Sequence, residues 1–185
     1  TSGDAGGSFT ATILEKVSVT NGDDTSHSLK YKNLITANTT YINSSNTQVA
    51  TYTFVDDTTL TSSGQVYIQN AGLVSPGSKQ SLYLADVKSV VKIIDTGSPS
   101  TQPTVAMLTN SSYDVTTNYI FDSGQRDSYY DHASLTLRPG APQPKGNLLV
   151  LVNYYQHSGG DGYFDVASYI SSSKPDTYQN IPTYT

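Results

Sequence analysis

Apolar and polar residues alternate along much of this chain, and a period of two is the pattern of a strand with one buried face. The first alternating stretch runs from Phe9 to Val19. Further stretches of strand length follow at residues 29–35, 49–55, 66–68, 87–94, 115–121, 135–137, 148–155 and 163–166. Residues 148–155 are strongly apolar, so we expect them at the centre of a sheet. Roughly eight to eleven strands of this length predict an all-β fold, in the form of a β-sandwich.

The stretch 87–94 also fits a helix, because Val87, Val90, Val91 and Ile94 have helical spacing. β-Branched side chains lose rotamer freedom in a helix, so four of them favour a strand. Apolar residues occupy both alternating sets of positions in this stretch. We therefore expect a strand that is covered on both of its faces.

Composition divides the chain into three parts. Residues 1–8 are small and polar, and are expected to form a flexible arm. Residues 9–80 are expected to form a strand-rich N-terminal extension. Residues 81–185 are expected to form the sandwich, of either the immunoglobulin/fibronectin type or the jelly-roll type. The pattern leaves open whether the two larger parts share one core, and the Ser/Pro-rich stretch 97–103 is the clearest internal boundary.

The overall composition excludes several functions. The 185 residues include 15 tyrosines, and Tyr and Thr favour pleated, half-buried surfaces. A formal charge of −5 with scattered basic residues argues against a nucleic-acid-binding face. No apolar run approaches the ~20 residues of a membrane span, so no membrane insertion is expected. Cysteine is absent, which excludes disulfides and the usual structural zinc sites, and we expect no cofactor.

The densest group of charged side chains lies in one short segment. It comprises Asp122, Gly124, Gln125, Arg126, Asp127, Tyr129, Tyr130, Asp131 and His132. If residues 125–132 form a helical turn, Asp127 and Asp131 share one face. Two carboxylates at a suitable separation hydrolyse glycosides, and Asp with His can bind a divalent cation.

The same residue types also have a purely structural interpretation. Arginine is a planar donor that clamps carboxylates or carbonyls, and aspartates cap turns. Gly124 allows a tight backbone. The acidic spacing is not that of a known metal site, and no ligand-dense calcium loop is present. We therefore interpret residues 122–132 as a structural motif between strands, with no catalytic residue and no metal.

A second candidate site is aromatic. Its members lie near the end of the chain and are Tyr154, Tyr155, Tyr163, Phe164 and Tyr169. Exposed tyrosines on a β scaffold stack on sugar rings or form a protein interface. Adjacent aromatic residues in a strand usually place one ring in the core and one outside, so only some of these are available for a ligand.

The second part of the chain resembles a known family. The similarity runs through segments 81–87, 92–95, 114–116, 119–132, 137–140, 144–146, 153–155, 162–164, 166–169 and 181–184. In this order they resemble a segment of large virion structural proteins of tailed phages, notably the contractile-tailed marine kind. The similarity covers about residues 82–185 and is most specific in the core Asp122-Ser123-Gly124-Gln125-Arg126-Asp127.

The resemblance implies a non-catalytic module of a tail, baseplate or fibre that acts through protein–protein contacts. It implies other virion proteins as partners, in a homo-oligomer or as a fragment of a longer chain. It also implies a place in the virion, after assembly in the host cytoplasm. Two alternatives from other classes stay open: a glycan-binding adhesin module that recognises the host surface, and a glycoside hydrolase that uses Asp127 and Asp131.

Overall fold

The structure is a computed structural model that describes residues 30–40, 42, 64–69, 77, 79–127, 129–159, 164–171 and 174–178. The strands are β1 Lys30–Ile35, β2 Gln65–Ile68, β3 Lys79–Ala85, β4 Val87–Asp95, β5 Tyr119–Asp122, β6 His132–Leu137, β7 Leu148–Gly159, β8 Ile170–Ser171 and β9 Lys174–Tyr178. The short helical segments are α2 Val105–Thr109 and the 3-10 turns η2 Ser111–Tyr113, η3 Thr116–Asn118 and η4 Val166–Tyr169. All strand pairs are antiparallel. The prediction of an all-β fold is confirmed.

Strand β7 is the centre of the larger sheet, as its apolar sequence predicts. β4 pairs with β7 along one edge, from Val87 opposite Tyr154 to Asp95 opposite Leu148. Along the other edge, β2 pairs with the first part of β7 and β1 with the second part. β7 can hold three partners because its 12 residues are long enough for two short strands to lie end to end on one side.

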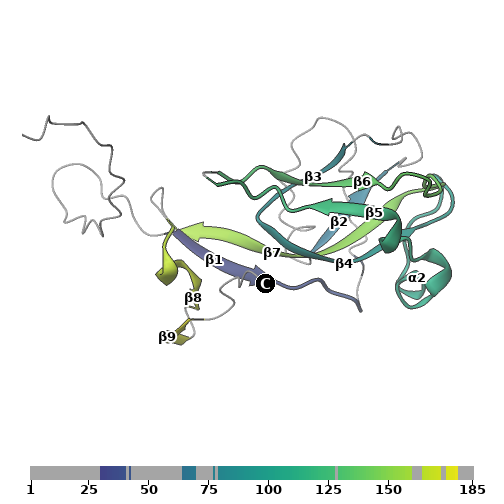
Figure 1. The fold of residues 1–185 in the computed structure, drawn as a ribbon. Helices are drawn as coiled ribbons and strands as arrows, with labels where there is room; N and C mark the ends of the chain where they lie inside the picture. Colours follow the sequence, from purple (N-terminus) through teal and green to yellow (C-terminus); the bar gives the residue numbers. More distant parts are fainter. Residues whose placement is uncertain are drawn as a thin grey trace, which may run out of the picture.

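The smaller sheet has the strand order β3-β6-β5. Figure 1 shows this sheet lying over β4 and β7, with β1 extending along the far part of β7 and α2 at the opposite end of the molecule. β8 and β9 form a separate two-stranded pair near β1.

One hydrophobic core joins the two sheets. Its buried members are Val66, Ile68, Leu82, Val87, Ile93, Ala133, Leu135, Leu148, Val150, Val152 and Tyr154. They come from β2, β4 and β7 of the larger sheet and from β3 and β6 of the smaller sheet. Val66 and Ile68 belong to the expected N-terminal extension, yet they lie in the same core as Leu135. Two antiparallel sheets over one core are consistent with the expected sandwich, whose type stays a prediction.

The larger sheet is covered on both faces, as the sequence of β4 predicts. Ile93 lies in the core between the sheets, whereas Ile94 lies in a second cluster with Leu108 of α2. Register shifts interrupt the pairing of β4 with β7 between Val87 and Ser89 and between Val90 and Lys92. These irregularities break simple alternation, so Val90 packs against the same core as Val87.

Two predicted strands are wrong in part. Residues 116–118 form the turn η3, because Oδ1 of Asp114 accepts hydrogen bonds from both N and Oγ1 of Thr116. Residues 166–169 likewise form the turn η4, where Oδ1 of Asp165 accepts from the backbone N–H of Ala167 at 2.6 Å. In both places an aspartate at the turn start competes with the extended backbone, as short polar side chains do.

The remaining expectations for the first part of the chain lie outside the described residues. These are the arm at residues 1–8 and the strands at 9–19 and 49–55. Within the described part of the chain, none of the helices has the length and apolar character that a membrane crossing requires.

Candidate functional site

A buried ion pair joins β1 to the link between the two sheets. Nζ of Lys32 lies 2.8 Å from Oδ2 of Asp86, and the two side chains are only 2% and 1% exposed. Removing two charges from water is costly, and their attraction compensates only if the remaining polar atoms also find partners. The groups around this pair therefore decide whether it is stable.

Asp86 is the single residue between β3 and β4, where the chain passes from the smaller sheet to the larger one. Its φ is +55°, in the left-handed region that Asp and Asn enter more readily than most residues. Its carbonyl oxygen accepts the backbone N–H of Tyr155 at 3.0 Å. This corner holds the carboxylate of Asp86 against β1 and β7.

Two further side chains satisfy the Asp86 carboxylate. Nε2 of His157 in β7 lies 2.8 Å from Oδ2, and Nε2 of Gln125 donates to Oδ1 at 3.0 Å. Burial by itself raises the pKa of Asp86. The hydrogen bonds from His157, Lys32 and Gln125 outweigh that effect and hold the pKa below its usual value. Asp86 is therefore ionised at neutral pH.

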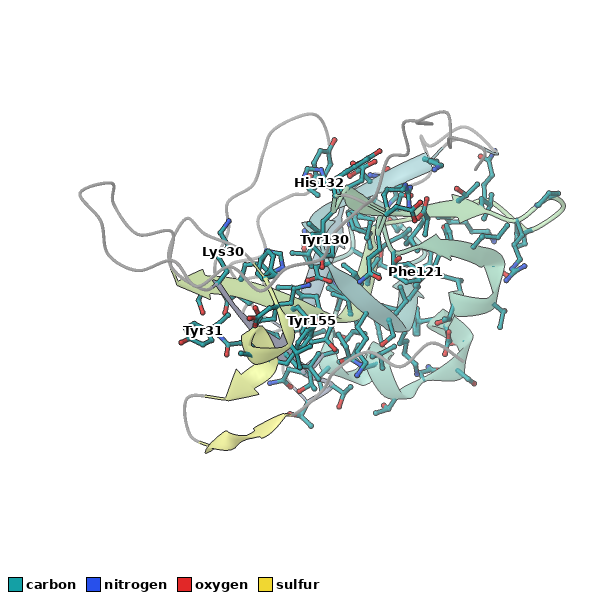
Figure 2. All side chains as sticks on the ribbon, turned by 60° about the vertical axis from the view of Figure 1, so that its left-hand side comes forward. Lys30, Tyr31, Phe121, Tyr130, His132 and Tyr155 are labelled. Atoms are coloured by element: carbon teal, nitrogen blue, oxygen red, sulfur yellow. The ribbon has the colours of Figure 1, made fainter. Side chains whose placement is uncertain are left out.

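Aromatic rings surround the ammonium group of Lys32. Nζ lies 4.2 Å from the ring centroid of Tyr130, 4.8 Å from Phe164, 5.5 Å from Tyr169 and 5.8 Å from Tyr155. A cation near the face of an aromatic ring is attracted to it, and more strongly when water is excluded. Nζ also donates a hydrogen bond to the hydroxyl of Tyr130. Tyr130 and Tyr155 are labelled in Figure 2.

These contacts keep Lys32 charged although it is buried. Burial lowers the pKa of Lys32, but the hydrogen bonds to Asp86 and Tyr130 and the attraction of the same two groups leave the pKa above its usual value. Burial also raises the pKa of Tyr155 to about 12, with added effects of the charges of Tyr169 and Asp86. We call the rings around the ion pair the enclosure; they belong to Tyr130, Tyr155, His157, Phe164 and Tyr169. The enclosure holds one lysine cation and one aspartate anion.

The rings of the enclosure also pack against one another. His157 and Phe164 have ring centroids 4.6 Å apart, and His157 and Tyr130 are 5.7 Å apart. Tyr155 and Tyr169 meet edge to face at 5.5 Å and 89°. Such tilted and edge-to-face pairs are favourable beyond their buried area. The rings come from the β5–β6 connection, β7 and the segment that contains η4, so the enclosure links parts of the chain that are distant in sequence.

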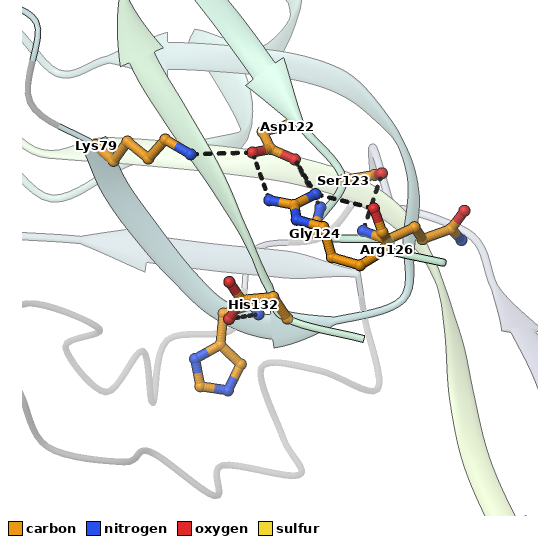
Figure 3. Close-up of polar contacts among 8 residues, drawn as sticks. Lys79, Asp122, Ser123, Gly124, Arg126 and His132 are labelled. Carbon is orange, nitrogen blue, oxygen red and sulfur yellow. Dashed lines mark hydrogen bonds and ion pairs between the residues drawn. The ribbon is translucent and has the colours of Figure 1, made fainter. Parts of the chain in front are cut away.

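The segment between β5 and β6 contains the predicted structural motif. The two terminal nitrogens of Arg126 donate to the two carboxylate oxygens of Asp122 at 3.0 and 2.9 Å, and Lys79 adds a contact at 3.2 Å (Figure 3). Oδ1 of Asp122 also accepts the N–H of Gly124 at 3.0 Å. The Arg126 hydrogen bonds, with those from Gly124 and Lys79, hold the pKa of Asp122 far below its usual value.

The helical turn considered for residues 125–132 is not what the described residues form. The described residues form a hairpin, in which Gln125 and Tyr130 make an antiparallel bridge and Arg126 N donates to Tyr129 O at 3.0 Å. Gly124 makes this possible, since its φ is +75° and a Cβ there would lie 2.3 Å from the carbonyl oxygen of Asp131. The positive φ of Gly124 and its close approach to Asp131 fit the hairpin and not a helix.

The hairpin has one side toward the ion pair and one toward solvent. Gln125 reaches Asp86 and Tyr130 reaches Lys32. Arg126 and Asp127 are exposed, and the side chain of Tyr129 is 60% exposed. Asp127 and Asp131, the two carboxylates of the hydrolase alternative, both lie on the exposed part of this hairpin and do not share a helical face.

The other predicted site residues fall in different places. His132 is the first residue of β6, with its ring 5.9 Å from that of Tyr83. Tyr154 lies in the core between the sheets, whereas its neighbour Tyr155 lies in the enclosure. Phe164 and Tyr169 also contact Lys32, so three members of the aromatic candidate site converge there. Tyr163 lies outside the described residues.

Comparison of this chain with protein families, curated proteins and solved structures finds no match. Among the residues that the structure describes, no group of three or more His, Asp or Glu side chains is arranged to hold a metal ion.

Sequence reasoning missed the two residues at the centre of the site. Lys32 lies in a strand where Tyr31 is the natural core candidate, yet Lys32 is buried and the Tyr31 side chain is exposed. Asp86 carried a clearer signal, because it is a single acidic residue within the apolar region 82–94. His157 was not a candidate site residue, and its partner is Asp86. A buried charge inside an apolar run is a reason to look for its counter-ion.

Proposed function

We propose that this chain is a structural, non-catalytic module of a phage virion, in a tail, baseplate or fibre, and that it acts through protein–protein contacts. The observation that carries this proposal is the Lys32–Asp86 enclosure. Its charges are satisfied internally, by Gln125, His157 and Tyr130, so they serve to hold strands together.

The connectivity of the enclosure supports a mechanical role. It contacts β1, the β3–β4 corner, the β5–β6 hairpin, β7 and the η4 segment. A buried charge pair of this kind is stable only when all of its hydrogen-bonding partners are in place. If one of these segments moves away, a buried charge on another segment loses its partner, which is costly. Such all-or-none coupling suits a part of a durable extracellular particle, which is what the resemblance of residues 82–185 implies.

Proteomics of purified particles tests the proposal directly. Phage particles from the source that encodes this sequence are purified by density gradient, and their proteins are quantified by mass spectrometry. We expect peptides of this chain at a copy number comparable to that of tail or baseplate proteins. The proposal is overturned if these peptides occur in the lysate and are lost from intact particles on purification.

A second candidate is glycan binding, which the exposed aromatic side chains of the hairpin favour. Tyr129 is 60% and Tyr130 40% exposed, and Tyr130 lies edge-on to Phe164 with centroids 6.2 Å apart. Aromatic faces presented to solvent bind sugar rings by stacking. A glycan array tests this candidate. Glycan binding that is lost in Tyr129→Ala supports an adhesin, whereas a folded chain that binds no glycan on the array excludes glycan binding.

A further inference from the structure

The Lys32–Asp86 pair brings an amine and a carboxyl group into contact, with both side chains buried. Nζ and Oδ2 are 2.8 Å apart, and the two side chains are 2% and 1% exposed. Groups fixed at contact distance react as if at very high concentration. We propose that Lys32 and Asp86 condense into an intramolecular isopeptide bond between Nζ of Lys32 and Cγ of Asp86. The proposal does not depend on the assembly in which the chain works.

The condensation is balanced without a cofactor. One proton moves from the Lys32 ammonium to Oδ2 of Asp86, which converts the ion pair into a neutral amine and a carboxylic acid. Burial by itself favours the two neutral groups, whereas the hydrogen bonds around the pair favour the charged groups, so the neutral pair is a minor form that the attack draws on. The neutral Nζ attacks Cγ, a second Nζ proton goes to the departing Oδ2 hydroxyl, and the C–Oδ2 bond breaks. The products are one amide, with a single hydrogen on nitrogen, and one water molecule.

The neighbours of the pair match the needs of this reaction. Gln125 donates to Oδ1 at 3.0 Å, where negative charge develops in the tetrahedral intermediate. His157 contacts Oδ2 at 2.8 Å and, with its proton on Nε2, donates to the oxygen that leaves. The hydroxyl of Tyr130 accepts from Nζ and holds the amine against the carboxyl group. Each reacting atom thus has its own hydrogen-bonding partner.

The surrounding rings protect the product from hydrolysis. Phe164, Tyr155 and Tyr169 surround the amine together with Tyr130, and they restrict the access of water that hydrolysis would need. A neutral amide also has a smaller desolvation cost than two buried charges. The bond would join β1 covalently to the β3–β4 corner.

Two other lysine–aspartate pairs provide internal controls. Lys92 and Asp114 are 3.4 Å apart with side chains 29% and 32% exposed, and Lys79 and Asp122 are 3.2 Å apart with 65% and 32% exposed. Both pairs lie in contact with water, which competes for the carboxyl group. We expect no amide at either pair.

The mass of the intact, folded chain tests the proposal. We expect the mass to be lower than the sequence mass by one water molecule. After trypsin digestion, cleavage after Lys32 should be absent, and peptide 31–79 should be found joined through Lys32 to Asp86 in peptide 80–88. The full sequence mass in the folded chain overturns the proposal, as does a water loss located at any other residue pair.

Variants separate condensation from simple pairing. Lys32→Arg keeps a buried cation but has no nucleophilic amine, so its full sequence mass is expected. Gln125→Leu and His157→Phe keep both reacting groups, and we expect at least tenfold slower crosslinking in freshly refolded chain, followed by mass spectrometry over time. His132→Phe is the matched histidine control and should crosslink at the wild-type rate. Unchanged rates in both Gln125→Leu and His157→Phe would remove the assigned roles of these two side chains.

Discussion

Gln125 and Tyr130 face each other as a bridge in the β5–β6 hairpin, and their side chains contact opposite members of one buried ion pair. Gln125 donates to Asp86, and Tyr130 accepts from Lys32. The outer side of the same hairpin carries the Asp122–Arg126 clamp. The conformation of this short segment and the stability of the ion pair are therefore coupled.

Gly124→Ala should be one of the most damaging single changes in the described chain. Its φ of +75° strains any residue with a Cβ, and that Cβ would lie 2.3 Å from the carbonyl oxygen of Asp131. We expect a loss of about 3 kcal/mol or more in the free energy of unfolding, measured by urea denaturation.

Gly140→Ala is the matched control, because φ there is +79° and the added Cβ meets nothing within 4 Å. Only the conformational strain applies, so we expect a loss of about 1–2 kcal/mol. Equal losses in Gly124→Ala and Gly140→Ala would show that the contact with Asp131 has no cost.

Lys32→Met should lower the free energy of unfolding by about 3–5 kcal/mol, because it leaves the buried Asp86 carboxylate without its main counter-charge. Combining it with Asp86→Asn should restore part of the loss, since the neutral amide removes the unpaired charge and Asn, like Asp, tolerates the φ of +55°. Neither variant can form the proposed isopeptide bond, so comparing them isolates the effect of the unpaired charge. A double variant less stable than Lys32→Met would contradict this account.

Arg126→Ala should lower the melting temperature, because it removes the two hydrogen bonds that tie the turn of the hairpin to Asp122 at the end of β5. Arg138→Ala is a suitable control, as Nε of Arg138 donates to the carbonyl of Thr117 at 3.0 Å and the side chain is likewise exposed. We expect a smaller fall for Arg138→Ala. If Arg126→Ala melts like the wild type but loses a binding activity, the clamp has a functional role and our structural interpretation fails.

Tyr119→Phe should make the protein less sensitive to alkali. Burial, with a smaller effect of the negative charge on Asp95, raises the pKa of Tyr119 to about 12 from a usual value of 10.0. The folded state therefore keeps Tyr119 protonated at a pH at which the unfolded state has already lost the proton. The stabilisation that Tyr119 gives is fully present below pH about 10, and it is lost as the pH rises from about 10 to 12. Denaturation at several pH values should show a shallower decline for Tyr119→Phe than for Tyr129→Phe, whose ring is exposed.

Local pattern was sufficient for much of the scaffold. The apolar run of β7 predicted the centre of a sheet, and the β-branched residues of β4 predicted a strand with both faces covered. Pattern failed at η3 and η4, where Asp114 and Asp165 form side-chain hydrogen bonds that start a turn. Those bonds depend on the exact position of a single aspartate, and they do not alter the apolar periodicity around it.

The sequence predicted two separate candidate sites, one polar and one aromatic, and the fold brings members of both together. Gln125 and Tyr130 belonged to the polar motif, while Tyr155, Phe164 and Tyr169 belonged to the aromatic group. Both groups meet at Lys32 and Asp86, which neither contained. The order of the residues along the chain carries no sign of this meeting.

The sequence by itself determined the all-β class, the central strand and the polar turn of residues 122–132, because these follow from periodicity and from the backbone preferences of a few residues. Only the tertiary structure decided that Lys32 faces inward and finds Asp86. A charge can be buried only when partners from distant segments arrive together, and here they come from β7, the hairpin and the η4 segment. That requirement is non-local, so it becomes visible only when the chain is folded.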